Sequence, residues 1–224
     1  NLFESFIKLI ASAIDAKSPY TGGHCERVPE ITMMLAEAVH QTKTGPFADF
    51  NLSDQEMYEL KIAAWLHDCG KVATPEFVVD KSTKLETIYD RINEVETRFS
   101  VLKRDQEIKK LKKELSIERD NSLNAKEKNE KFKFIKNEYQ KSIKRLKNDL
   151  SFVKESNIGG EFMSEDKKQR INDISNYKWK PNGKMQNFLS ENEVYNLTIP
   201  RGTLTPEERQ VINDHIVVTI NMLD

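Results

Sequence analysis

Apolar residues recur at intervals of three and four along most of this 224-residue chain. Such intervals place side chains on one face of an α-helix, whereas a half-buried β-strand needs strict alternation. Two runs keep this pattern over long stretches. The first is Leu85, Ile88, Ile92, Val95, Phe99 and Leu102, with a shift to Ile108, Leu111 and Leu115. The second is Phe132, Ile135, Tyr139, Ile143, Leu146, Leu150 and Val153.

A polar break separates these two runs and predicts a hairpin. Residues 118–131 contain Asp120, Asn121 and Ser122, which favour a turn. Apolar seams with this spacing are typical of coiled coils. We therefore predict an all-α fold with an antiparallel coiled-coil hairpin at about 86–155. Its arms are expected to be roughly 50 Å long, at about 1.5 Å per residue.

Further helices are predicted on both sides of the hairpin. One covers 2–15 and ends before Pro19, because the residue preceding a proline avoids the α region. Another covers 24–42. A serine or threonine followed three residues later by glutamate is a capping box, which begins a helix. The capping boxes are Ser53 with Glu56, Ser190 with Glu193 and Thr205 with Glu208; the last of them opens one helix that carries His215 and continues to the end of the chain.

The overall charge gives no reason to expect a nucleic-acid polymer as partner. The formal net charge is −1 and the pI is about 6.5. Residues 103–149 hold 16 basic and 9 acidic side chains. We interpret this local excess as a solvated hairpin surface, because few aromatic residues lie among the basic ones.

The sequence also bears on the compartment. It has no run of about 18 apolar residues, so we expect no membrane contact. Cys25 and Cys69 do not form a closely spaced pair, which favours free thiols and a cytoplasmic location. The chain begins at Asn1 with a helical pattern already running, so we expect it to be part of a longer protein.

The His67-Asp68 pair is the first candidate for chemistry. It ends the apolar run that follows Ser53, where an unpaired Asp68 carboxylate would be costly to bury. A divalent metal would remove this cost, since imidazole and carboxylate bind iron, manganese and zinc. Lys71, four residues after His67, is close enough to stabilise a bound phosphate. Taken alone, the pair fits a surface or satisfied polar pair without function better than a metal site.

Three motifs that follow one another along the sequence favour a metal site over a polar pair without function. They are 21–28 (TGGHCERV), 67–71 (HDCGK) and 202–209 (GTLTPEER), with His215 on the helix that follows. This arrangement resembles the HD superfamily of metal-dependent phosphohydrolases, and more narrowly its HD-GYP branch of cyclic-dinucleotide phosphodiesterases. The similarity covers residues 2–85 and 202–224.

The resemblance implies a helical-bundle fold and a set of site residues. The metal ligands would be His24, His67, Asp68 and His215. Two divalent ions, iron or manganese, would be bound, and the substrate would be cyclic di-GMP. Asp68 and Lys71 would be catalytic, with Lys71 contacting the substrate phosphate or the attacking hydroxide. Arg27 would contact phosphate or, equally, form a surface ion pair.

The sequence departs from the family pattern in two ways. Residues 86–201 are expected to be an insertion between core segments 1–85 and 202–224, made of the hairpin and a small helical subdomain at about 156–201. The paired histidines, the Gly-Tyr-Pro signature and the final aspartate of the family would follow Asp224, so the site is expected to be partial. Tyr20 stands where some relatives have a third-metal glutamate, which favours two metals. His40 matches no motif and is expected to be an exposed helix-end residue.

Other functions stay open at this point. The chain could be an HD hydrolase of another nucleotide or phosphoester. It could also be an inactive HD module that senses a ligand or docks a partner through its basic hairpin. The hairpin could mediate a homodimer, with the first helix continuing from an upstream sensor domain.

Overall fold

The computed structural model describes residues 2–16 and 23–223, and within these ranges the chain is helical apart from one two-stranded sheet. The all-α prediction is therefore confirmed. The chain divides into two compact units, Asn1–Asp80 with Pro206–Asp224 and Lys81–Thr205. No helix among the described residues is long and apolar enough to cross a bilayer.

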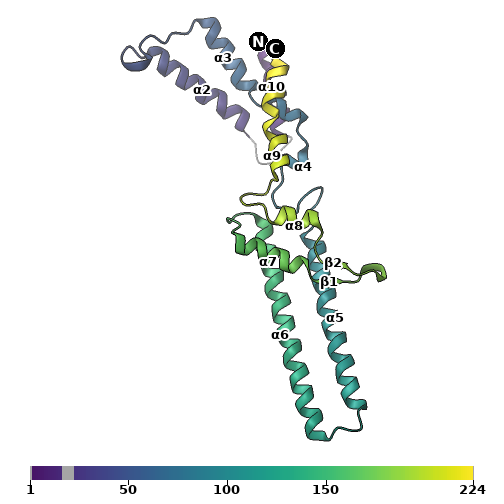
Figure 1. The fold of residues 1–224 in the computed structure, drawn as a ribbon. Coiled ribbons are helices and arrows are strands. Elements are labelled where there is room, and N and C mark those ends of the chain that lie inside the picture. Colours follow the sequence, from purple (N-terminus) through teal and green to yellow (C-terminus); the bar gives the residue numbers. More distant parts are fainter. Residues whose placement is uncertain (1, 17–22, 224) are drawn as a thin grey trace. The chain divides into compact units, whose positions relative to one another are not determined.

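The first unit consists of helices contributed by both ends of the chain (Figure 1). Its elements are α1 (Leu2–Asp15), α2 (His24–Gln41), η1 (Gly45–Phe47), α3 (Asp54–Leu66), η2 (Cys69–Ala73), α4 (Glu76–Val79), α9 (Pro206–Asn213) and α10 (His215–Leu223). The predicted capping box at Ser53 is present, with the Ser53 side chain accepting from the Glu56 N–H. The bounds of α1 match the prediction, and α2 ends at Gln41, one residue before the predicted end.

The C-terminal helix differs from the prediction. Instead of one continuous helix, α9 ends at Asn213 and α10 begins at His215, with Asp214 between them. The Asp214 N–H still donates to Gln210 O at 2.9 Å, so the interruption is a local turn rather than a loop. His215 consequently lies at the first residue of a helix.

The second unit is built on a long helical hairpin. Its elements are α5 (Ile92–Arg119), α6 (Ala125–Ile158), α7 (Glu165–Ser175), β1 (Lys178–Trp179), η3 (Pro181–Gly183), β2 (Gln186–Asn187) and α8 (Glu191–Leu197). Helices α5 and α6 run antiparallel side by side and are joined at the tip (Figure 1). The turn ends where Asn124 caps α6, because its side chain accepts from the Lys126 and Glu127 N–H groups.

The core of this unit lies at the base of the hairpin. Its buried members are Leu85, Val95, Phe99, Leu102, Leu146, Val153, Ile171, Ile174, Phe188, Leu189 and Leu197. Phe99 and Phe188 meet edge to face with ring centroids 4.6 Å apart. The core thus joins α5 and α6 to α7, α8 and the segment between them.

Three predictions about this unit were wrong in detail. Helix α5 begins at Ile92, whose N–H donates to the Asp90 carboxylate at 2.9 Å. Leu85 is buried outside the helix, and Ile88 is 94% exposed. The expected small helical subdomain also contains the antiparallel β1–β2 pair, with Lys178 opposite Asn187. The shifted seam of Ile108, Leu111 and Leu115 does not face α6, and each of these side chains is about half exposed.

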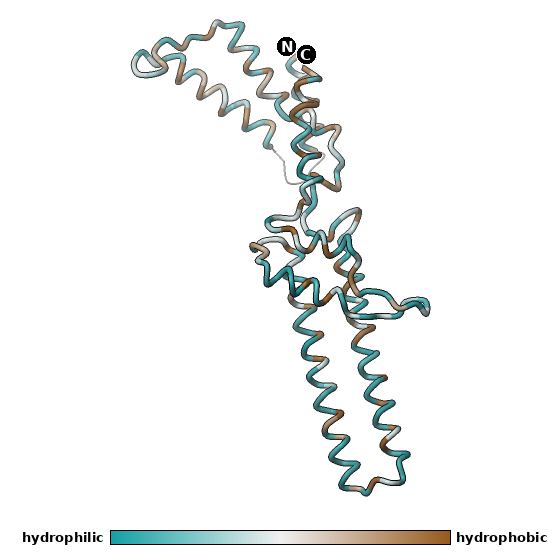
Figure 2. The backbone as a smooth tube through the Cα atoms, viewed as in Figure 1, coloured by the Kyte–Doolittle hydropathy of each residue, from teal (hydrophilic) through white to brown (hydrophobic). Residues whose placement is uncertain are grey.

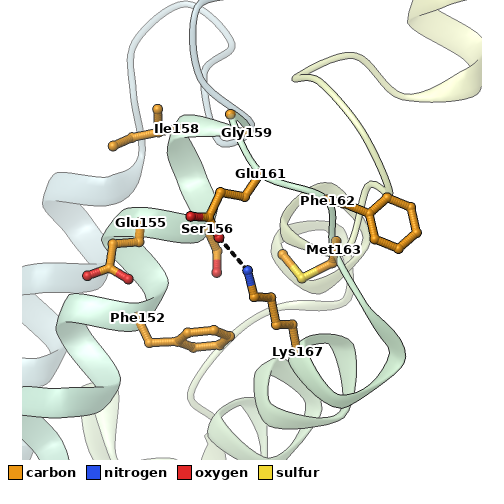
Figure 3. A pocket seen from close by; sticks show the side chains of 10 residues that line it. Phe152, Glu155, Ser156, Ile158, Gly159, Glu161, Phe162, Met163 and Lys167 are labelled. Carbon is orange, nitrogen blue, oxygen red and sulfur yellow. Dashed lines mark hydrogen bonds and ion pairs between the residues drawn. The ribbon is translucent and has the colours of Figure 1, made fainter.

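A cavity of about 230 Å³ lies at the C-terminal end of α6 (Figure 3). Phe152, Phe162 and Met163 line it, and Lys167 closes one side through an ion pair with Glu161 at 2.5 Å. The one lysine in its lining is therefore already neutralised by a carboxylate, so the cavity is not a good anion site.

A buried ion pair holds α8 against α5. Arg98 donates to both carboxylate oxygens of Glu193, at 2.8 and 2.5 Å, and the Glu193 side chain is 3% exposed. Burial by itself raises the pKa of Glu193, but the hydrogen bonds from Arg98 and Ser190 hold it below its usual value. Because the folded-state pKa is lowered, this contribution to stability is full above about pH 4.3, the pKa of an unfolded glutamate, and is lost as the pH falls further.

We predict that Glu193→Gln lowers the free energy of unfolding by about 3 kcal/mol, because it leaves the Arg98 charge without its buried partner. Urea denaturation at pH 7 measures the change. Glu94→Gln is the matched control, since Glu94 is 48% exposed and lies 3.6 Å from the same guanidinium group; its loss should cost under about 1 kcal/mol. Equal effects of the two substitutions would contradict a dominant buried pair.

Candidate metal centre

The end of α3 positions the His67-Asp68 pair. His67 is the residue after the last turn of α3, and its Nδ1 lies 2.8 Å from Ala64 O. Asp68 follows with a non-helical backbone and precedes η2. The sharp change of direction between α3 and η2 directs the side chain of Asp68, which is 7% exposed, into the unit.

Four of the predicted site residues converge on the Asp68 carboxylate. Its Oδ2 lies 2.6 Å from Lys71 Nζ, 3.1 Å from His67 Nε2 and 3.5 Å from His24 Nε2. Its Oδ1 lies 3.3 Å from His215 Nε2. These partners come from η2, the end of α3, the start of α2 and the start of α10. The structure thus brings residues from both ends of the chain to one carboxylate.

The donor atoms of this cluster are close enough to share a metal ion. The ligand atoms of His24, His67 and Asp68 all lie within 4.8 Å of one another. The Nε2 atoms of His24 and His67 are 3.3 Å apart, and the two rings meet edge to face. Two imidazoles and a carboxylate form a donor set that suits iron, manganese or zinc.

Backbone carbonyls fix the orientation of two of the rings. His67 Nδ1 contacts Ala64 O and His215 Nδ1 contacts Ile212 O. A carbonyl only accepts, so in each neutral ring Nδ1 carries the proton and Nε2 carries the lone pair. Both Nε2 lone pairs then face the Asp68 carboxylate, which also only accepts. Such an arrangement is unfavourable unless a cation or a proton lies between the atoms, so this donor set fits a bound divalent metal.

The environment keeps Asp68 ionised. Burial by itself raises the pKa of this carboxyl, but the hydrogen bond and the charge of Lys71 hold it below its usual value, as do His67 and His215 in their protonated forms. Lys71 is therefore an ion-pair partner of Asp68 in this structure. It stays within reach of anything bound at that carboxylate.

Cys25, next to His24, is a weaker ligand candidate. Burial, together with a hydrogen bond to Asp15, raises the pKa of the Cys25 thiol to about 12. The thiolate is the form that binds metals, so this side chain stays protonated and outside the donor set. Asp15 also accepts from the Cys25 N–H at 3.1 Å, which ties the end of α1 to the start of α2.

The remaining predicted residues lie around the cluster. Arg27 is exposed on α2, one turn after His24, close to the backbone of Gly23. Tyr20 lies outside the described residues. The prediction for His40 was wrong: it does lie in the last turn of α2, but it is half-buried, and its Nδ1 accepts from the Leu52 N–H at 3.1 Å.

Sequence reasoning missed two residues that hold the cluster together. The Gly70 N–H donates to the buried Thr219 Oγ1 at 2.9 Å. A Cβ added at Gly70 would lie 2.0 Å from His215 O and 2.7 Å from Thr219 N. Only glycine therefore lets α10 approach η2 this closely. The spacing of four residues between His215 and Thr219 indicated that both lie on one helix face. Nothing in the sequence indicated that Gly70 is the partner of Thr219.

Comparisons with known proteins give local similarity. A stretch of 83 residues, 37% of this chain, is 35% identical to the 3'3'-cGAMP-specific phosphodiesterase 3 of Vibrio cholerae. A stretch of 77 residues is 34% identical to the 3'3'-cGAMP-specific phosphodiesterase 2 of the same organism. The chain spans 16% and 13% of the lengths of these two curated relatives. No family model and no solved structure matches the chain.

We predict that Gly70→Ala destabilises the chain by at least about 2 kcal/mol, because the added methyl group collides with backbone atoms of α10. Hydrogen exchange should show faster exchange in α10 first. Gly160→Ala is the control, since a Cβ there meets no atom within 4 Å. Unchanged protection of α10 in Gly70→Ala would contradict the close approach.

Proposed function

We propose that this chain is part of a metal-dependent phosphodiesterase that hydrolyses a cyclic dinucleotide. The observation that carries the proposal is the convergence of His24, His67 and His215 on the Asp68 carboxylate, with two Nε2 lone pairs directed at it. The local similarity to two cyclic-dinucleotide phosphodiesterases supports the substrate class. The resemblance to the HD superfamily agrees with both.

In this proposal, the metal ligands are His24, His67, Asp68 and His215. We expect two bound ions, of iron or manganese. A bound divalent cation supplies Lewis-acid activation of water and neutralises charge on a phosphate. The protein residues do the rest. Ala64 O and Ile212 O fix the ring orientations, so Nε2 of His67 and His215 is available without rearrangement.

Lys71 has the role of electrostatic stabiliser. Its Nζ lies 2.6 Å from Asp68 Oδ2, so it could donate to an oxygen of a phosphate bound at the metal that Asp68 would hold. An ammonium group fixed before the reaction stabilises the additional negative charge of the transition state. Arg27 is exposed near His24 and is proposed to contact a second phosphate of the substrate.

The substrate base is the finer part of the proposal. The family resemblance implies cyclic di-GMP, whereas the relatives are named for 3'3'-cGAMP. Both ligands are cyclic purine dinucleotides that contain guanine, so we propose this class. The proposal also includes a cytoplasmic location and an upstream sensor domain in the natural protein.

We predict that the full natural protein binds about two equivalents of iron or manganese and hydrolyses cyclic di-GMP or 3'3'-cGAMP. The double variant His67→Ala/Asp68→Ala should lose both properties. His40→Gln is the control, since it removes an imidazole outside the cluster. Metal analysis after anaerobic reconstitution and chromatography of the products measure the two properties separately.

The outcomes separate the alternatives. The natural protein could bind metal, and the double variant lose it, without turnover of either dinucleotide. That result would indicate that the substrate is another phosphoester. No bound metal after reconstitution would overturn the enzyme proposal in favour of a binding module. Metal retained equally by the double variant would contradict the assignment of ligands.

A further inference from the structure

Near the base of the hairpin, helix α5 contacts α6 through apolar residues. Val95, Phe99 and Leu102 are buried there. Farther along the hairpin, polar side chains take their place: Gln106 and Lys110 lie in a narrow crevice with Tyr139 and Ser142 of α6. Lys110 Nζ lies 5.4 Å from the centre of the Tyr139 ring. The inner face of α5 is therefore polar between Gln106 and Lys113, and the half-buried Ile117 follows on the same face.

Four other apolar residues of distal α5 lie on its opposite face. They are Val101, Ile108, Leu111 and Leu115, which we call the outer seam; their exposed fractions are 37%, 49%, 53% and 50%. In Figure 2 hydrophobic segments continue along the hairpin toward its tip. Successive residues of the outer seam follow a heptad pattern. Position a is taken by Val101, Ile108 and Leu115, which are spaced seven residues apart, and position d by Leu111.

Charged residues flank the outer seam in a self-complementary order. With Val101 at position a, the g positions are Glu107 and Glu114, and the e positions are Asp105, Lys112 and Arg119. In a parallel pair of helices, each g residue faces the e residue five positions later on its partner. Glu107 would then face Lys112 of a second copy, and Glu114 would face its Arg119. An antiparallel pair would instead place Glu107 opposite Glu114.

We propose that the outer seam of α5 binds the same seam of a second copy of this chain, parallel and in register. This inference is independent of the phosphodiesterase proposal, since it uses only α5. The seam from Val101 to Leu115 is about 21 Å long at about 1.5 Å per residue. Arg104 occupies one d position, so the apolar contact is short and interrupted. The dimer is therefore reversible.

Sedimentation equilibrium of the full chain tests the proposal. The expected result is a reversible dimer of twice the 26.0 kDa monomer mass. Ile108→Glu should weaken it at least about tenfold, because the substitution buries a charge in each copy. Phe134→Glu is the matched control: Phe134 is 66% exposed on α6, outside the seam, and its replacement should leave the dissociation constant unchanged. Circular dichroism verifies that both variants stay helical.

A charge exchange tests the parallel register. Glu107→Lys alone and Lys112→Glu alone should each weaken the dimer several-fold, and the two together should restore it. A monomer at concentrations up to about 100 μM would overturn the proposal. So would a dimer insensitive to Ile108→Glu, which would place the contact elsewhere. Association through copurified nucleic acid, detected by absorbance at 260 nm and removed by nuclease, would also overturn it.

Discussion

The close contact between α10 and η2 is the constraint on which the candidate metal centre depends. Gly70 and Thr219 are 149 residues apart in sequence, yet the Gly70 N–H donates directly to the Thr219 hydroxyl. This contact places the first residue of α10, His215, beside Asp68. The three histidines then surround one carboxylate although the motifs that carry them are dispersed over the whole chain. A side chain at residue 70 would prevent this.

The long second unit does not separate the two halves of the site, because its ends are joined to each other. The Thr203 hydroxyl donates to Lys81 O at 3.0 Å, next to the residues where the chain enters and leaves the unit. The buried Lys84 reinforces the same region by donating to Leu197 O and Ile199 O, at 3.0 and 2.9 Å. Residues 81–205 can therefore form a unit with its own core while residues 80 and 206 stay close in space.

Sequence periodicity predicted the helices well, because three-four spacing and capping boxes act locally. It predicted less well which face of a helix is covered. Ile108, Leu111 and Leu115 share a face with correct heptad spacing, but α6 contacts the opposite face of α5. The Asp90 carboxylate accepts from the N–H of Ile92, the first residue of α5, and a single turn at Asp214 interrupts the helix before His215. Periodicity reveals neither feature. The site residues were selected by motif, whereas Gly70 and Thr219 emerged only from the packing of α10.

We propose that a divalent metal is held by the cluster of His24, His67, Asp68 and His215. X-ray absorption spectroscopy of the manganese- or iron-loaded natural protein can detect these ligands, because imidazole rings give a characteristic outer-shell scattering pattern. We expect a first shell of nitrogen and oxygen with scattering from two or more imidazoles per cluster. A shell of oxygen alone, without imidazole scattering, would contradict it.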